Sequence, residues 1–289
     1  MTLSRKQALK TMAMGAAGSL ALPNFALAFK ALSPELKNNI NHSVCKWCFP
    51  NIPLEELVIA SKEMGIKSVE LLRSEEWPVV IKHGLTCAMG YATTISLNKG
   101  FNDPTLHEQL LKDYSVSIPK AAEAGLKNLI CFSGNTNGLT SEQGLENCAK
   151  GLEPVMKIAA QYNITVSMEL LNSKINHKDY QCDHTEWGVK LCEKLGSENF
   201  KLLYDIYHMQ VMEGDVIGTL TKYKNYIAHY HTAGVPGRHE IDDTQELNYP
   251  AIMKAIIATG FKGHVAQEFV PAKPDKIASL KQAVDICDI

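Results

Sequence analysis

The sequence alternates short runs of β-branched and apolar residues with longer stretches of helical periodicity. The expected strands are residues 40–47, 67–72, 85–90, 128–133, 164–170, 201–207, 227–232 and 264–270. The expected helices include residues 54–64, 106–124, 145–162, 185–195, 249–259 and 276–286. Repeated β-then-α units predict a parallel sheet, and eight of them within about 250 residues predict closure into a (β/α)8 TIM barrel.

Glycines mark the ends of several expected helices. Gly65, Gly125, Gly196 and Gly260 each follow a helical stretch, where a left-handed cap is expected. An open doubly wound sheet is the alternative fold. It is disfavoured because the first strand-to-helix turn lacks GxGxxG and the chain contains no GxxxxGK[ST] motif.

The first 28 residues have the layout of an export signal. Basic residues between Arg5 and Lys10 precede an apolar run of small residues, Pro23, and an A-x-A site that ends at Ala28. The basic stretch resembles a twin-arginine motif with lysine in place of the second arginine. We expect cleavage after Ala28, a single barrel domain over 29–289, and a periplasmic location without stable membrane insertion. The alternatives are an uncleaved anchor, an amphipathic first helix, and a cytoplasmic protein.

Charge and cysteine content narrow the functional classes. With 29 Lys and Arg against 31 Asp and Glu, the net charge is -2, so the chain lacks the basic surface expected of a nucleic-acid-binding protein. The eight cysteines form no obvious disulfide framework, and most are expected to be small buried side chains. Cys45 and Cys48 form a CxxC pair for which a disulfide is the alternative.

Four expected strands carry a charged or imidazole side chain near their carboxyl ends. These residues are Glu169, Asp205, His231 and Glu268. Active sites of TIM barrels lie at the carboxyl ends of the strands, so the four side chains are expected at one rim. Three carboxylates and one imidazole are suitable ligands for one divalent ion, with Mn²⁺ or Mg²⁺ favoured over Co²⁺ or Zn²⁺.

Three further residues are candidates for substrate contact. Arg238 lies in a glycine-containing loop that we expect to be mobile, and its guanidinium suits a substrate carboxylate. The alternative for Arg238 is a surface ion pair with a nearby acid. Glu70 ends the second expected strand and is a candidate for binding a substrate hydroxyl. His208 is a candidate for either substrate contact or support of a metal ligand.

Several motifs in the second half of the chain resemble the xylose isomerase-like TIM barrels. They are ELLN at 169–172, DxxH at 205–208, HxHxAGVPGRHE at 229–240, LNYP at 247–250 and QEF at 267–269. The VPGRHE and LNYP stretches most resemble hydroxypyruvate isomerases.

The resemblance implies a role for each matching position. Glu169, Asp205, His231 and Glu268 would hold the metal, and Glu169 and Glu268 would also move the proton. His208 and Arg238 would contact the substrate. His231 departs from the hydroxypyruvate isomerases, which often carry Gln there, and matches the epimerase branch. Related barrels form dimers or tetramers, so a homo-oligomer is expected on the resemblance alone.

This reading predicts an isomerase that acts on a small hydroxy-carbonyl compound, with hydroxypyruvate converted to tartronate semialdehyde as the leading reaction. A divalent ion would stabilise an enediolate while carboxylates remove and return a proton. The alternatives are a sugar or keto-sugar epimerase, a lyase or dehydratase of an oxidised sugar, and a sugar-acid-binding protein without turnover. An endonuclease IV-like role would need a histidine-rich cluster and a basic groove, and is disfavoured.

Overall fold

The structure, a computed structural model, describes residues 35–289. The expected export signal at residues 1–28 lies outside this part of the chain. Within residues 35–289, no helix combines the length and apolar character needed to cross a membrane.

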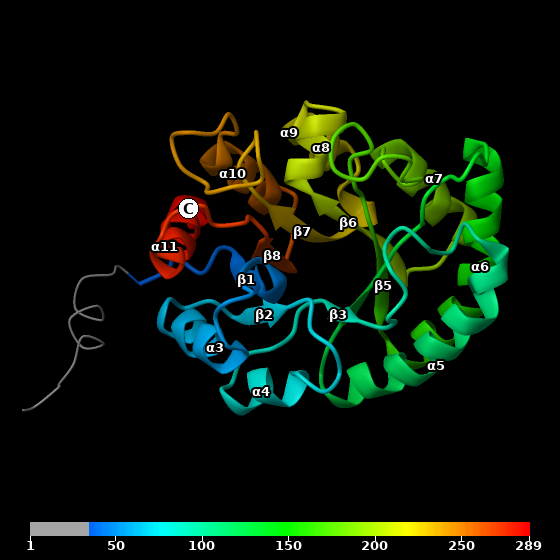
Figure 1. The fold of residues 1–289 in the computed structure, drawn as a ribbon, viewed down its shortest axis with the longest axis horizontal. Coiled ribbons are helices and arrows are strands. Elements are labelled where there is room, and N and C mark those ends of the chain that lie inside the picture. Colours follow the sequence, from blue (N-terminus) through cyan, green and yellow to red (C-terminus); the bar gives the residue numbers. More distant parts are fainter. Residues whose placement is uncertain (1–34) are drawn as a thin grey trace, which may run out of the picture. The chain divides into compact units, whose positions relative to one another are not determined.

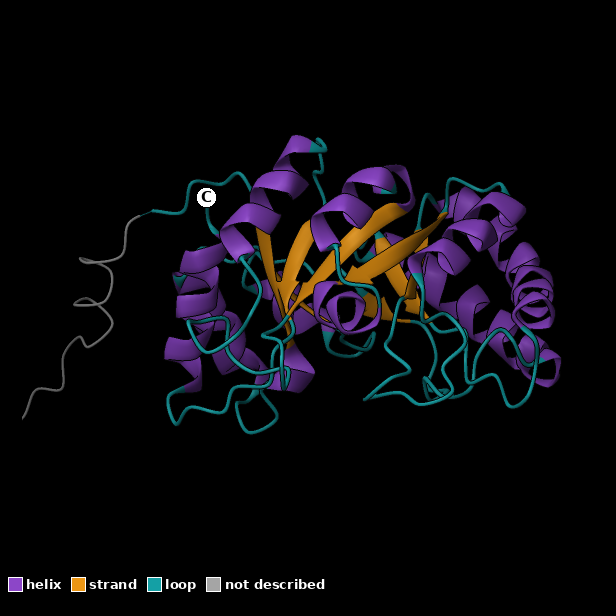
Figure 2. Ribbon diagram, turned by 90° about the horizontal axis from the view of Figure 1, so that it is seen from above, coloured by secondary structure: helices purple, strands orange, loops and turns teal. Residues whose placement is uncertain are grey.

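Eight parallel strands form the centre of the fold, and the helices surround them (Figures 1 and 2). The strands are β1 (Asn41–Cys45), β2 (Ser68–Glu70), β3 (Gly90–Tyr91), β4 (Asn128–Cys131), β5 (Thr165–Glu169), β6 (Phe200–Asp205), β7 (Ile227–Thr232) and β8 (His264–Gln267). The helices are α3 (Leu54–Glu63), α4 (Trp77–Lys82), α5 (His107–Glu123), α6 (Ser141–Tyr162), α7 (Thr185–Leu195), α8 (Ile206–Met212), α9 (Val216–Lys222), α10 (Tyr249–Ala258) and α11 (Lys276–Cys287). The predicted TIM barrel is confirmed.

The barrel closes between β2 and β3, which stand at the two ends of the strand order. The strand order is β2-β1-β8-β7-β6-β5-β4-β3, and two parallel bridges, Ser68 with Thr86 and Leu72 with Gly90, join β2 to β3. The expected third strand at 85–90 is wrong in its bounds. The Ala88 N–H donates to the side-chain hydroxyl of Ser68 in β2 instead of to a backbone carbonyl of that strand, which interrupts the ladder before Gly90.

The helix ends agree with the sequence analysis, whereas three short helices were not expected. The four glycines predicted as left-handed caps all have positive φ, between 57° and 82°. The short helices α4, α8 and α9 were not expected, because six or seven residues give too little periodicity to detect.

All eight cysteines are free and buried, so the prediction of small buried side chains is confirmed.

Strand β7 shows how the barrel separates its two packing layers. Tyr230 points toward the surrounding layer, where its ring packs against Tyr204 of β6 and Phe261 before β8. His229 and His231 alternate with Tyr230 and share the opposite, inner face. Both imidazoles are fully buried. The apolar core therefore lies between strands and helices, while the carboxyl-end interior of the barrel is polar.

The amino terminus of α6 provides a test of the local contribution to stability. Thr140 Oγ1 accepts from Gln143 N at 3.1 Å, and Gln143 Oε1 accepts from Thr140 N at 2.9 Å, which completes a capping box. Thr140→Ala removes one acceptor and should lower the free energy of unfolding by about 1 kcal/mol, measured by urea denaturation. Thr140→Ser keeps the hydroxyl and should stay near wild type. Equal losses in both variants would contradict the capping explanation.

Candidate metal centre and active site

Four ligand-type side chains converge at the carboxyl ends of four adjacent strands. Glu169 ends β5, Asp205 ends β6, His231 lies in β7, and Glu268 directly follows β8. Register brings them together, because Asp205 pairs with His231 and His231 pairs with Ala266 on β8. One ligand atom from each of the four lies within 4.8 Å of the other three. The structure thus places the predicted quartet in one buried cluster.

The donor atoms of this cluster are close together without satisfying one another. His231 Nδ1 lies 2.8 Å from Glu268 Oε2 and 3.4 Å from Glu169 Oε1. Even so, both His231 Nδ1 and Glu169 Oε1 are buried without a hydrogen bond of acceptable geometry. Buried polar atoms normally have a hydrogen-bond partner. Unpaired ligand atoms that face one point are therefore consistent with a cation that they would all bind. The three carboxylates and one imidazole therefore suit a single divalent ion.

One carboxylate oxygen of Asp205 faces the cluster, and the other caps the helix that follows the strand. Its Oδ1 accepts from Tyr207 N at 2.8 Å and His208 N at 3.2 Å, and this caps α8 directly after the strand. Its Oδ2 faces the cluster and lies 3.1 Å from Arg238 Nη2. The strand-to-helix turn therefore fixes the direction of the carboxylate.

Glu70 lies beneath the quartet and supports it. Its Oε1 accepts from His231 Nε2 at 3.0 Å and from His229 Nε2 at 2.7 Å, while Ser43 Oγ donates to Oε2. The bond from His231 Nε2 fixes a proton on that nitrogen and directs Nδ1 at the cluster, where its unprotonated form could bind an ion. Burial alone would raise the pKa of Glu70, but the two imidazoles lower it below its ordinary value.

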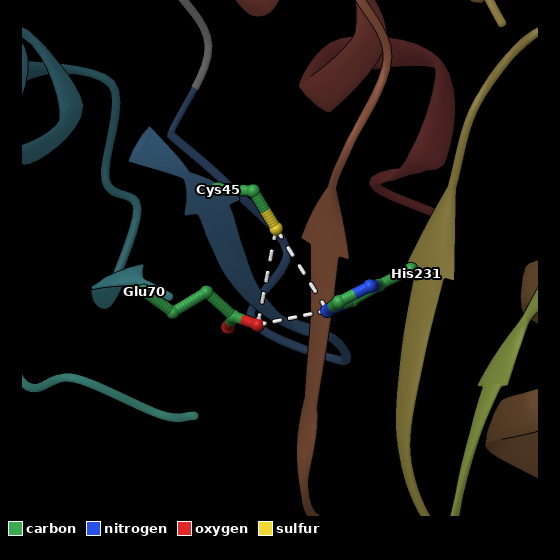
Figure 3. Close-up of side chains that lie close together, drawn as sticks. All are labelled: Cys45, Glu70 and His231. Atoms are coloured by element: carbon green, nitrogen blue, oxygen red, sulfur yellow. Dashed lines mark hydrogen bonds and ion pairs between the residues drawn. The ribbon is translucent and has the colours of Figure 1, made fainter. Parts of the chain in front are cut away.

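This placement differs from the expectation that Glu70 binds a substrate hydroxyl. The carboxylate has no exposed surface, and histidine and serine donors occupy its oxygens. Figure 3 shows Cys45, Glu70 and His231 pointing toward one another from β1, β2 and β7. Cys45 Sγ is 3.8 Å from His231 Nε2 and 4.0 Å from Glu70 Oε1, so the thiol packs beside this pair.

Glu268 is held at both oxygens by residues from other parts of the chain. Trp47 Nε1 donates to Oε1 at 2.7 Å, and Arg238 Nη2 donates to Oε2 at 2.5 Å. The Arg238 guanidinium lies between two rings, 5.3 Å from Trp47 and 5.4 Å from Tyr207. Trp47 was not among the residues proposed for the site from the sequence, and its hydrogen bond to Glu268 is seen only in the structure.

The loop that carries Arg238 is tied down at several points. Arg238 N donates to Gly234 O at 2.9 Å, and Val270 N donates to Arg238 O at 2.7 Å. Tyr249, from the LNYP motif, accepts from Ala233 N and donates to Ala233 O through its buried hydroxyl. Arg238 adopts a left-handed φ of 61°, which these bonds stabilise. These bonds anchor the loop that the sequence analysis expected to be mobile.

His208 lies beside Arg238 at the edge of the cluster. Its Nε2 is 2.7 Å from Arg238 Nη1 and 3.6 Å from Asp205 Oδ2, and its Nδ1 faces Asn172. Burial and the Arg238 charge lower the pKa of His208 well below its ordinary value, which keeps the ring neutral. Sequence reasoning missed Asn172, although it closes the ELLN motif.

The carboxylates of the cluster differ in their affinity for protons. Burial and the charge of Glu268 raise the pKa of Glu169. Burial also raises the pKa of Asp205 to about 7, although Arg238 opposes this. Burial would raise the pKa of Glu268 too, but His231 and Arg238 hold it well below its ordinary value. Unequal proton affinities among neighbouring carboxylates are typical of acid–base sites.

The support that Glu70 gives His231 leads to a prediction about metal affinity. Glu70→Gln keeps the shape but removes the negative charge and one acceptor. It should weaken Mn²⁺ binding about 10- to 100-fold, because carboxylates that orient a ligating histidine have effects of this size. Isothermal titration calorimetry on metal-free protein measures the change.

Glu240→Gln is the matched control for this test. Glu240 is also a buried carboxylate, but it accepts from Ala272 N, Lys273 N and Ser279 Oγ beside α11. Mn²⁺ affinity should therefore remain at the wild-type value in this variant. Unchanged affinity in Glu70→Gln, or an equal loss in Glu240→Gln, would remove the assigned role of Glu70.

Two known isomerases share sequence with parts of this chain. A hydroxypyruvate isomerase of Escherichia coli is 33% identical over 172 residues, which cover 58% of this chain and 65% of that protein. A 2-oxo-tetronate isomerase of Cupriavidus necator is 35% identical over 113 residues, covering 39% of this chain and 43% of that protein. The matched segments thus span less than two thirds of either relative.

A solved structure and a family model cover more of the chain. The structure of an AP endonuclease, family 2, from Brucella melitensis superposes with a TM-score of 0.76 at 23% identity. It covers 83% of this chain and 96% of that one, and supports the fold alone. The family model for the xylose isomerase-like TIM barrel matches residues 60–287, which confirms the resemblance. The chain therefore belongs to the xylose isomerase-like TIM barrel family.

Proposed function

We propose that this protein is a divalent-metal-dependent isomerase of a small hydroxy-carbonyl compound, with hydroxypyruvate as the leading substrate and tartronate semialdehyde as the product. One observation carries the proposal. Glu169 Oε1 and Glu268 Oε2 lie 3.4 Å and 2.8 Å from the same atom, His231 Nδ1, so two carboxylates flank one buried point. The relatives named as hydroxypyruvate and 2-oxo-tetronate isomerases support the substrate class.

The reaction requires removal of a proton from a carbon next to a carbonyl. In hydroxypyruvate the C3 proton is removed, C2 receives a proton, and a hydroxyl proton moves from O3 to O2, so mass is conserved. A divalent ion, when bound by Glu169, Asp205, His231 and Glu268, supplies Lewis-acid stabilisation of the negative charge on the substrate oxygens. The proposed ion is Mn²⁺ or Mg²⁺, with Co²⁺ and Zn²⁺ as the alternatives.

The carboxylates of the chain would move the proton. Glu268 is held rigidly by Trp47 and Arg238, which gives it the fixed direction that proton transfer needs. Glu169 Oε1 makes no hydrogen bond within the protein, so this carboxylate is not held by other side chains as Glu268 is. Arg238 has a side chain that is 12% exposed and would meet the substrate carboxylate.

A second candidate, epimerisation of a keto sugar, is favoured by His231. Hydroxypyruvate isomerases often have Gln at this position, whereas the epimerase branch has His. The same pair of carboxylates would then return the proton to the carbon that lost it, from the opposite face. The position at which deuterium enters the product distinguishes the two reactions.

Proton exchange tests the proposed isomerase directly. We expect the Mg²⁺-loaded protein to exchange the hydroxymethyl protons of hydroxypyruvate in D2O, followed by NMR, faster than the uncatalysed background. Glu268→Gln and Glu169→Gln should each lower the rate by about 100-fold or more, because each removes a proton-transfer group. Glu240→Gln, in which the replaced carboxylate lies away from the cluster, should retain wild-type exchange.

Two results would count against hydroxypyruvate isomerisation. Absence of exchange above background, with metal binding verified, would remove hydroxypyruvate as a substrate and direct the search to keto sugars. Exchange that persists in both glutamine variants would instead retain the substrate and remove the assigned proton carriers.

We also propose that residues 1–28 are an export signal that directs the protein to the periplasm. The order of basic residues, apolar run and A-x-A site supports this. The protein recovered from the periplasmic fraction should begin at Phe29, as read by amino-terminal sequencing. Replacing Ala26 and Ala28 with larger side chains should block this cleavage. A full-length protein confined to the cytoplasm would contradict the proposal.

A further inference from the structure

His208 faces hydrogen-bond donors at both ring nitrogens. Asn172 offers two donors to Nδ1, its backbone N at 3.2 Å and its side-chain Nδ2 at 2.6 Å. On the other side, Arg238 Nη1 lies 2.7 Å from Nε2. Arginine has no acceptor, and a neutral imidazole can accept at one nitrogen only. The contacts of Asn172 decide which nitrogen this is.

The orientation of the Asn172 amide is fixed by its own neighbours. Its Oδ1 accepts from Ile175 N and Asn176 N, each at 3.0 Å. Its Nδ2 also donates to Asn176 Oδ1 at 2.8 Å. Exchanging the oxygen and nitrogen would place the NH₂ group against two backbone donors. The side that faces His208 is therefore the NH₂ group.

These contacts determine the protonation state of His208. With two N–H groups of Asn172 directed at Nδ1, that nitrogen must accept and carries no proton. A doubly protonated ring is excluded for the same reason. The proton therefore lies on Nε2, where Arg238 offers no acceptor and Asp205 Oδ2, at 3.6 Å, is beyond hydrogen-bond distance.

We propose that Asn172 is a positioning residue that locks His208 as the Nε2–H tautomer, so that His208 and Arg238 present two N–H donors to one substrate oxygen. The inference rests on the proposed function for the identity of that oxygen. Two N–H groups whose nitrogens are 2.7 Å apart repel each other unless they turn toward a common acceptor beside them, and an anionic oxygen can accept from both. A carboxylate or enolate oxygen has this chemistry.

The lock limits what His208 can do in the reaction. With Nδ1 occupied by Asn172 and Nε2 protonated, His208 can donate a hydrogen bond but cannot accept a proton from substrate carbon. Proton removal therefore falls to the carboxylates, and His208 with Arg238 stabilises negative charge on oxygen.

Nitrogen-15 NMR of the Mg²⁺-loaded protein tests the lock in the absence of substrate. Long-range proton–nitrogen correlations distinguish the two tautomers, and loss of signals in His208→Gln assigns them. We expect an unprotonated Nδ1 and a protonated Nε2 in the wild type. In Asn172→Asp a carboxylate replaces the NH₂ group at Nδ1, so Nδ1 should become protonated.

Asn176→Asp is the matched control. Asn176 Oδ1 accepts from Asn172 Nδ2 and the Tyr207 hydroxyl, so an aspartate there adds the same charge nearby and keeps the acceptor. Its His208 signals should retain the wild-type pattern. With hydroxypyruvate as substrate, Asn172→Asp should lower kcat/KM at least about 10-fold, and Asn176→Asp should change it little.

The outcomes separate this inference from the proposed function. A protonated Nδ1 in the wild type, or an unchanged tautomer in folded Asn172→Asp, would overturn the lock whatever the substrate. The expected tautomers together with no turnover of hydroxypyruvate would support the lock and reject the substrate. Equal tautomer changes in both aspartate variants would show that charge alone acts, and would also overturn the role of Asn172.

Discussion

Three buried carboxylates at one end of the barrel set the constraint on which the rest of the site depends. Glu169, Asp205 and Glu268 lie close enough to share one ion, and burying like charges is unfavourable unless positive charge compensates them. His231 lies between two of these carboxylates, and Arg238 bonds to Asp205 and Glu268. A divalent ion matches this demand in charge, donor type and position.

The supporting residues make this arrangement rigid. Glu70 holds His231 from below, the α8 turn holds Asp205, Trp47 holds Glu268, and Asn172 holds His208. Each of these bonds involves a backbone group or a buried side chain with few alternative positions. In the proposed reaction, a preorganised site of this kind would stabilise charge without rearranging, which is the main electrostatic contribution that enzymes make.

Much of the site could be predicted because parallel strands end together. In a (β/α)8 barrel all carboxyl strand ends share one rim, so Glu169, Asp205, His231 and Glu268 had to approach each other once the strands were identified. The third strand was placed wrongly because the side-chain hydroxyl of Ser68 in β2, rather than a backbone carbonyl of that strand, takes the Ala88 N–H. The anchored loop at Arg238 was also missed, since Tyr249 and Val270 fasten it from segments that follow β7.

The sequence by itself determined the barrel, the strands that carry the site and the chemical types of the converging side chains, because these follow from local periodicity and strand alternation. Only the tertiary structure decided which atoms bond. Glu70 and His231 are 161 positions apart, and Trp47 and Glu268 are 221 apart. Hydrogen bonds depend on ångström-scale distances and on rotamers, which packing of distant segments sets. For that reason Glu70 was expected in the pocket and is found supporting His231, and the orientation of Asn172 emerged from the folded chain alone.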